Sequence, residues 1–146
     1  MRSSVSARAR WSACALGLGL LATACGGTGA ISTGNAPIVN VTERDFQISA
    51  PTTVAAGEVV LRVHNQGPVG HELIVVRAPN ATLPLRSDGL TVNEERLQRT
   101  EVGALEPIDA PATRDLILRL TPGRYVLFCN MSGHFIGGMH HVLVVR

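Results

Sequence analysis

The sequence predicts an all-β sandwich of about seven or eight short strands. Beyond residue 36, runs rich in β-branched and other apolar residues alternate with turn sequences such as AAG, NQGP and TPG. The chain has 146 residues, 45% of them hydrophobic, which is enough for one compact domain with a core. Short strands at regular spacing over about 110 residues are typical of a sandwich.

Seven segments carry the strand pattern, and we expect them to pair antiparallel. They span residues 38–43, 45–51, 58–65, 71–78, 114–120, 124–130 and 140–146. Residues 87–105 do not follow the alternation of strands and turns, and the segment NEERLQR within them is typical of a short surface helix of two turns at most. We expect residues 87–105 to form a long connection at one edge of the sandwich.

Residues 1–24 have the composition of an export signal. Arg2, Arg8 and Arg10 precede an apolar run from Trp11 to Ala24, and GGTGA follows soon after. A membrane-spanning helix needs about 20 apolar residues, so this run is too short to be one. We therefore expect the domain to be exported.

Cys25 follows a sequence that resembles the lipobox of bacterial lipoproteins, in which the cysteine is lipidated. Ala22 stands where leucine is preferred, so simple signal cleavage near Ala24 stays open as an alternative. Residues 25–36 then form a lipid anchor and a flexible tether, and residues 37–146 form the domain. The expected location is the periplasmic or cell-surface side of a bacterial membrane.

The charge of the mature chain excludes one class of partner. Three of the 13 basic residues lie in the signal, which leaves 10 arginines against 11 acidic residues, a net charge of 10 − 11 = −1. Without a basic stripe or interleaved aromatic residues, we expect no nucleic-acid binding. We expect a monomer.

Cys129 is the one cysteine left once the signal and Cys25 are accounted for. It has no internal partner for a disulfide. An unpaired thiol in an oxidising compartment is expected to be either a buried core residue or a metal ligand.

The segment after Cys129 places His134 five residues on and Met139 five residues further. Five extended residues span about 17 Å, too far for ligands of one metal, so the segment must fold back. The glycines of SGHFIGGM supply the backbone freedom. A thiolate, an imidazole and a thioether suit copper in both oxidation states, and His71, after the turn NQGPVG, is the natural fourth ligand.

Other interpretations of these residues are open at this point. A buried cysteine near a surface histidine can arise by chance, and Met139 taken alone is more typical of a residue that packs in the hydrophobic core. Zinc binds cysteine and histidine, but methionine suits it poorly. His140 or His141 is an alternative to His134, whereas His64 is expected on the outer face of its strand.

Two segments, AAGEVVLRVHNQGPVGHELIVV and TPGRYVLFCNMSGHFIGGM, resemble the cupredoxins, the type 1 (blue) copper proteins, over residues 45–146. The spacing after Cys129 is closest to the rusticyanin and sulfocyanin type. The resemblance implies an eight-stranded Greek-key sandwich and a single Cu(I)/Cu(II) ion. It makes His71, Cys129 and His134 the strong in-plane ligands, with both imidazoles bound through Nδ1, and Met139 the weak axial ligand.

Three residues are expected to support the ligands. Glu72 follows His71 where plastocyanin and azurin often have asparagine. Its carboxylate can accept a hydrogen bond from the Ser132 hydroxyl or from a backbone N–H of the ligand loop, or it can face solvent. Asn65, the first residue of the NQGPVG turn, is the third supporting residue.

The expected function is extracytoplasmic electron transfer, without enzyme activity, because four protein ligands leave no position for a substrate. A single cysteine in the loop excludes a binuclear purple-copper centre, and the chain length excludes the multidomain copper oxidases. Redox partners are expected at an apolar patch around His134, formed by residues 133, 135–138, 68 and 69. The alternatives are copper storage or delivery, and a metal-free lipid-tethered interaction module.

Overall fold

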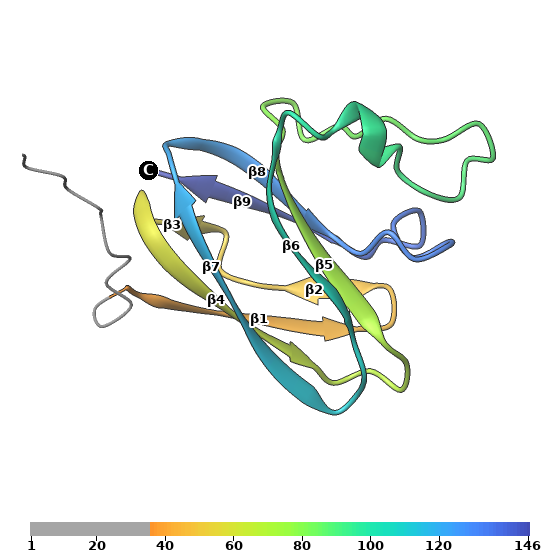
Figure 1. Cartoon of the computed structure of the whole chain (residues 1–146), viewed down its shortest axis with the longest axis horizontal. Helices are drawn as coiled ribbons and strands as arrows, with labels where there is room; N and C mark the ends of the chain where they lie inside the picture. Colours follow the sequence, from red (N-terminus) through yellow and green to blue (C-terminus); the bar gives the residue numbers. More distant parts are fainter. Residues whose placement is uncertain (1–35) are drawn as a thin grey trace, which may run out of the picture. The chain divides into compact units, whose positions relative to one another are not determined.

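Residues 36–146 are described by a computed structural model, in which they form a β-sandwich of nine strands (Figure 1). The expected signal, Cys25 and nearly all of the tether lie outside the described residues. The strands are β1 (Ile38–Arg44), β2 (Gln47–Ser49), β3 (Thr53–Val54), β4 (Gly57–Asn65), β5 (His71–Arg77), β6 (Glu101–Ile108), β7 (Ala112–Leu120), β8 (Gly123–Phe128) and β9 (His140–Val145).

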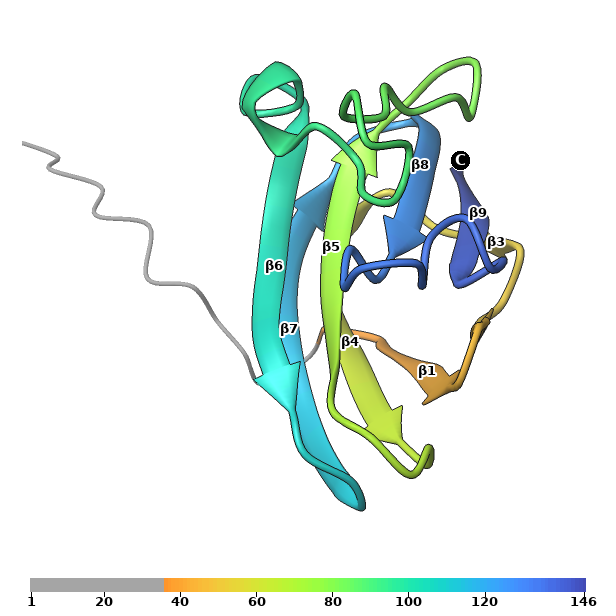
Figure 2. The ribbon, with the colours of Figure 1, turned by 90° about the vertical axis from the view of Figure 1, so that its right-hand side faces the viewer.

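The strands form two facing sheets. One sheet has the order β2-β1-β4-β7 and the other the order β3-β9-β8-β5-β6 (Figures 1 and 2). The all-β sandwich is confirmed, but the expectation of purely antiparallel pairing was wrong. Strand β1 pairs in parallel with β4, and β3 pairs in parallel with β9. Parallel pairs need a crossover connection, and here the chain passes from one sheet to the other between the paired strands.

The core lies between the sheets and follows from alternation along each strand. In β1, Val39 and Val41 are buried while Ile38 and Asn40 face solvent. The facing sheet contributes Leu73 and other fully buried residues to the same cluster. Burial of each side chain of this size contributes about 1.5–3 kcal/mol to the free energy of unfolding. This cluster therefore holds the two sheets together and fixes the ends of the loops that connect their strands.

Residues 87–105 differ from the expectation in two ways. The expected helix is a single 3₁₀ turn, η1 (Glu94–Arg96), capped by the Asn93 side chain. Strand β6 begins at Glu101 and was missed because it is an edge strand with few buried residues and a proline, Pro107. The stretch also covers the outer face of its sheet, since Val92 and Leu97 are buried against residues of β5 and β8.

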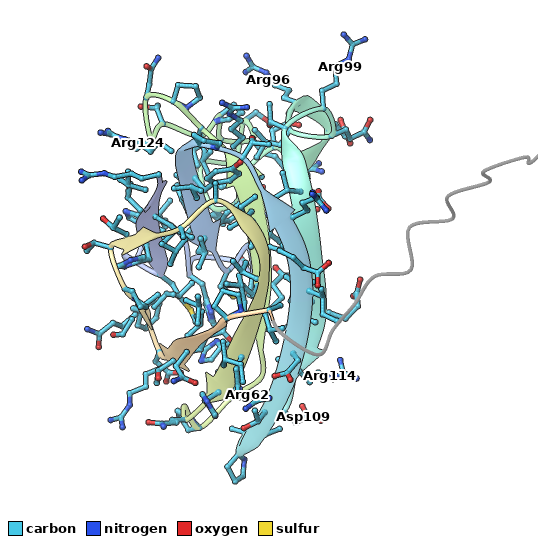
Figure 3. The ribbon with its side chains drawn as sticks, turned by 90° about the vertical axis from the view of Figure 1, so that its left-hand side faces the viewer. Arg62, Arg96, Arg99, Asp109, Arg114 and Arg124 are labelled. Atoms are coloured by element: carbon cyan, nitrogen blue, oxygen red, sulfur yellow. The ribbon has the colours of Figure 1, made fainter. Side chains whose placement is uncertain are left out.

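The charged side chains are dispersed over the surface. In Figure 3, Arg96, Arg99 and Arg124 lie toward one end, and Arg62 and Arg114 toward the other. Arg62 donates two hydrogen bonds to Asp115 across β4 and β7, of 2.9 and 2.8 Å, and solvent screens this exposed pair. Within residues 36–146, no helix has the length and apolar character to cross a membrane.

Candidate metal centre

The predicted ligands lie at the end of the sandwich where β4, β5, β8 and β9 meet (right-hand end in Figure 1). His71 is the first residue of β5, Cys129 directly follows β8, and Met139 directly precedes β9. Phe128 pairs with His140 at the base of the β8–β9 loop. The loop therefore starts and ends at adjacent points of one sheet.

Backbone hydrogen bonds fold this loop back on itself. The Cys129 N–H donates to the Met139 carbonyl at 3.2 Å, and the Met139 N–H donates to the His134 carbonyl at 3.0 Å. Gly133 and Gly138 have φ values of 83° and 109°, a region that favours glycine. The chain reversal expected from the ligand spacing is thus built on these two glycines.

The structure brings three of the predicted ligands together. His71, Cys129 and His134 each offer one ligand atom, and these atoms all lie within 4.8 Å of one another. Cys129 Sγ is 3.5 Å from His134 Nδ1, and the two imidazole centroids are 5.2 Å apart. His71 and Cys129 are fully buried, while His134 is partly exposed. The site therefore opens to the surface on the His134 side.

The ring nitrogens of His71 are buried. Neither Nδ1 nor Nε2 makes a hydrogen bond within the described residues. The Nε2 atom lies 3.1 Å from Asp45 Oδ1 and close to Gly67, so Nδ1 is the nitrogen left for the cluster. Burial and the neighbouring His134 lower the pKa of His71, against the opposing effect of Asp45. A buried, neutral imidazole with a free Nδ1 is suited to bind a metal ion. Without a ligand or a hydrogen bond, burial of that nitrogen would cost folding free energy.

The Cys129 thiol is suited to metal binding and poorly suited to nucleophilic chemistry. Burial is the main cause that raises its pKa to about 11, and the carboxylates of Glu72 and Glu43 add to the effect. Backbone amides of Met131 and Glu72 oppose this by favouring the thiolate. Without a cation the group is a thiol at neutral pH, and a metal ion would supply the charge that stabilises the thiolate.

Met139 completes a donor set of two imidazoles, one thiolate and one thioether. Its side chain is fully buried and belongs to the same core cluster as Cys129. This soft set suits copper in both oxidation states and suits zinc poorly. The cluster is thus of a kind suited to a copper ion.

Glu72 connects the start of β5, which carries His71, to the loop that carries the other ligands. Its Oε1 accepts a hydrogen bond of 2.9 Å from the backbone N–H of Asn130, the residue after Cys129. Burial raises the pKa of Glu72, and this hydrogen bond opposes the rise. Of the alternatives for Glu72, the structure thus shows the backbone contact, and Ser132 makes no side-chain hydrogen bond among residues 36–146.

Asn65 shapes the loop between β4 and β5 that leads to His71. Its Nδ2 donates to the carbonyls of Val69 and Ile108, at 2.8 and 2.7 Å, and its Oδ1 accepts from the Gly67 N–H at 2.9 Å. Asn65 is only 1% exposed, so three hydrogen bonds satisfy it in a nearly dry environment. Losing such a buried amide leaves several groups unpaired.

The other histidines lie outside the three-residue cluster. His64 faces outward from β4, with its ring nitrogens near Thr113 Oγ1 at 2.9 Å and Asn40 Oδ1 at 3.4 Å. His140 is exposed beside the ring of Phe135, and His141 Nε2 lies 3.3 Å from the Pro51 carbonyl. The structure thus places His134, and not His140 or His141, beside Cys129.

The contribution of the β1–β2 turn was not expected from the sequence. Residues 45–51 were predicted to form one strand, whereas Asp45 and Phe46 form the turn between β1 and β2. Asp45 reaches His71, and the Phe46 ring lies 5.4 Å from the ring of His134. The residue pattern carries no signal for these contacts, because the turn is distant from His71 and His134 along the chain.

No protein-family model and no curated protein sequence matches this chain. Solved structures do resemble it. The dithionite-reduced auracyanin of the photosynthetic bacterium Roseiflexus castenholzii is 16% identical, over 77% of this chain and 99% of its own, with a TM-score of 0.57. Auracyanin A of Chloroflexus aurantiacus, described as a blue copper protein, is 18% identical over 77% and 100%, also at 0.57.

Reduced rusticyanin is 19% identical over 77% of this chain and 81% of its own, with a TM-score of 0.53. At these identities the likeness concerns the fold, which agrees with the two-sheet topology described above. The resemblance of the sequence to the cupredoxins is therefore confirmed at the level of the fold. Residues 36–146 have the cupredoxin fold, shared with the auracyanins and rusticyanins.

Proposed function

We propose that this protein binds one copper ion through His71, Cys129, His134 and Met139, and carries electrons outside the cytoplasm. The observation that carries the proposal is the convergence of a buried thiol and two imidazoles within 4.8 Å. The unpartnered Nδ1 of His71 supports it, because that atom needs a ligand or a hydrogen bond. The similarity to copper proteins of the same fold also supports it.

The residues around the site hold the ligands in place. Glu72 ties the loop after Cys129 to β5, and Asn65 ties the loop before His71 to β6. A copper ion held there would accept and release one electron. A frame that keeps the ligands in one arrangement limits the rearrangement that accompanies each transfer. We therefore favour electron transfer over storage or delivery, which require a ligand set that releases its metal readily.

Electrons would enter and leave through His134, the ligand that is partly exposed. The Phe46 ring packs against that of His134 and is 51% exposed. Val69 and Ile136, on the loops that precede β5 and β9, are also exposed apolar side chains, at 45% and 51%. Such a patch suits brief docking of another redox protein with an apolar surface. We did not expect Phe46 in this patch from the sequence.

The location follows from residues outside the described part of the chain. We propose that residues 1–24 direct export and that Cys25 carries a lipid, which places the domain on the periplasmic or outer side of a bacterial membrane. A lipid anchor keeps an electron carrier near membrane-bound partners. Cleavage without lipidation would leave the domain free in the same compartment.

A visible and paramagnetic-resonance spectrum combined with a redox titration tests the proposal. The purified protein with one equivalent of Cu(II) is expected to show an intense thiolate-to-copper charge-transfer band and a reversible one-electron couple. Stoichiometric copper without the intense band would exclude a type 1 site. Rapid loss of copper to a competing chelator would favour storage or delivery, and absence of binding would favour the metal-free interaction module.

The variant Met139→Gln is expected to keep copper and its colour while lowering the midpoint potential. An amide oxygen is a harder donor than a thioether and favours Cu(II) over Cu(I), and the two side chains are similar in length. A spectroelectrochemical titration beside the wild type measures the shift. Loss of copper binding in this variant would mean that Met139 is needed to build the site and is more than a weak axial ligand.

A further inference from the structure

The two-residue turn between β1 and β2 touches both imidazoles of the candidate site. Asp45 Oδ1 lies 3.1 Å from His71 Nε2, and the Phe46 ring packs against the ring of His134. The turn comes from the β2-β1-β4-β7 sheet, whereas Cys129, His134 and Met139 come from the facing sheet. It is thus a third segment at the site, besides the two that carry ligands.

The turn is held against the ligand loop in an unusual conformation. Phe46 has a φ of 61°, a left-handed value that a residue with a large side chain rarely adopts. A Cβ at Gly137 would collide with the Phe46 ring, so the absence of a side chain there allows this close approach. Strained backbone of this kind persists where surrounding contacts enforce it, and it is concentrated at functional sites.

Asp45 faces Nε2 of His71, the nitrogen of that imidazole that is not available to the metal. The Nε2 atom of His71 is buried beyond the reach of solvent, so a proton on it needs an acceptor from the protein. The 3.1 Å separation is within range, although the N–H is not aligned for a finished hydrogen bond. The Asp45 side chain is 39% exposed.

We propose that Asp45 is a positioning residue for the copper ligand His71. Resting on the proposed function, this inference assigns to Asp45 two effects on that site. Its carboxylate holds the proton on Nε2, which leaves Nδ1 free to bind the metal. Its negative charge also strengthens the imidazole as a donor and stabilises Cu(II) more than Cu(I), since the former carries the higher charge.

Two substitutions separate the charge from the hydrogen-bond acceptor. Asp45→Asn removes the charge and keeps a carbonyl oxygen, and Asp45→Ala removes both. The control Glu58→Gln removes one negative charge at the start of β4, at the end of that strand remote from Asn65 and the site. All three replace side chains that are not fully buried, so the fold should be retained.

The first measurement is the midpoint potential of the copper-loaded proteins. Loss of a carboxylate beside a metal-bound histidine typically changes metal affinity 10-fold or more. For Asp45→Ala we expect the Cu(II) to Cu(I) ratio at a fixed applied potential to fall about tenfold, a rise of about 59 mV in midpoint potential. Asp45→Asn should lie between Asp45→Ala and the wild type, and Glu58→Gln should match the wild type.

The second measurement needs no metal. Long-range ¹⁵N–¹H spectra of the metal-free protein, at a pH where the imidazoles are neutral, report which nitrogen of His71 carries the proton. The wild type and Asp45→Asn should hold it on Nε2, whereas Asp45→Ala should show a mixture of tautomers. Unchanged potentials and an unchanged tautomer in both variants would overturn the proposal.

The two measurements also distinguish this inference from the proposed function. If the wild type binds copper without the intense band, the type 1 site fails, and the tautomer spectra still decide whether Asp45 positions His71. If the band is present and both Asp45 variants behave as the wild type, the electron carrier stands and the role of Asp45 is excluded.

Discussion

Replacing Cys129 by serine is expected to abolish the intense visible band of the copper-loaded protein. The band requires a thiolate, and a serine hydroxyl is neither soft nor ionised at neutral pH. Affinity for Cu(II) should fall as well, because two imidazoles and a thioether remain. Absorption spectra of the two proteins at equal copper loading measure the change.

Stability needs a separate control in this experiment. Cys129 is fully buried, so a serine hydroxyl there costs about 1–3 kcal/mol if it finds no partner. Chemical denaturation of the metal-free Cys129→Ser protein therefore accompanies the spectra, together with Cys129→Ala, which introduces no hydroxyl. A folded serine variant that keeps the intense band would show that Cys129 is not the copper ligand.

Glu43→Gln is expected to stabilise the folded domain at alkaline pH by several kcal/mol. Glu43 is fully buried in β1, and neither carboxylate oxygen has a hydrogen-bond partner within residues 36–146. Burial, with a smaller contribution from the charge of Glu72, raises its pKa from 4.5 to about 8. The folded state therefore holds a proton that the unfolded chain has already lost.

The sign of the pH dependence follows from this difference. Below pH 4.5 both states are protonated and Glu43 adds no pH dependence. Between 4.5 and about 8 the free energy of unfolding falls as pH rises, by about 1.36 kcal/mol per unit, to an upper figure of about 5 kcal/mol. The glutamine side chain does not ionise, so Glu43→Gln lacks this decrease in the free energy of unfolding.

Denaturation of the metal-free proteins at a series of pH values measures the effect. Wild type and Glu43→Gln should differ little at the acid end and diverge steadily above it. The exposed Glu95, at η1, supplies the matched control, and Glu95→Gln should follow the wild type throughout. The same slope in Glu43→Gln as in the wild type would mean that Glu43 ionises in the folded protein as it does in the unfolded chain.

Sequence patterns were most informative where the requirement is local. Alternation of apolar residues predicted β1 and β4, because the two faces of each strand meet different environments. A continuous apolar run predicted β5, which is buried on both faces. Alternation failed for β6, whose place at a sheet edge leaves most of its side chains exposed. It also failed for the parallel pairing of β1 with β4, since pairing depends on how distant segments cross between sheets.

The candidate ligands were predictable because chemistry restricts them. A lone cysteine, a histidine and a methionine on one glycine-rich segment are unusual enough to indicate a metal site without a structure. The roles of neighbouring residues were harder to predict. Glu72 had two possible orientations, and only the position of the Asn130 amide relative to β5 decided between them.

By itself, the sequence determined the strand-rich domain, the four candidate ligands and the need for a folded-back loop after Cys129. These features depend on residue type and on spacing along one segment. Only the tertiary structure decided that Asp45 and Phe46 reach the two imidazoles and that Glu43 is buried. Those contacts join segments of opposite sheets, and their distances are set by how the sheets pack.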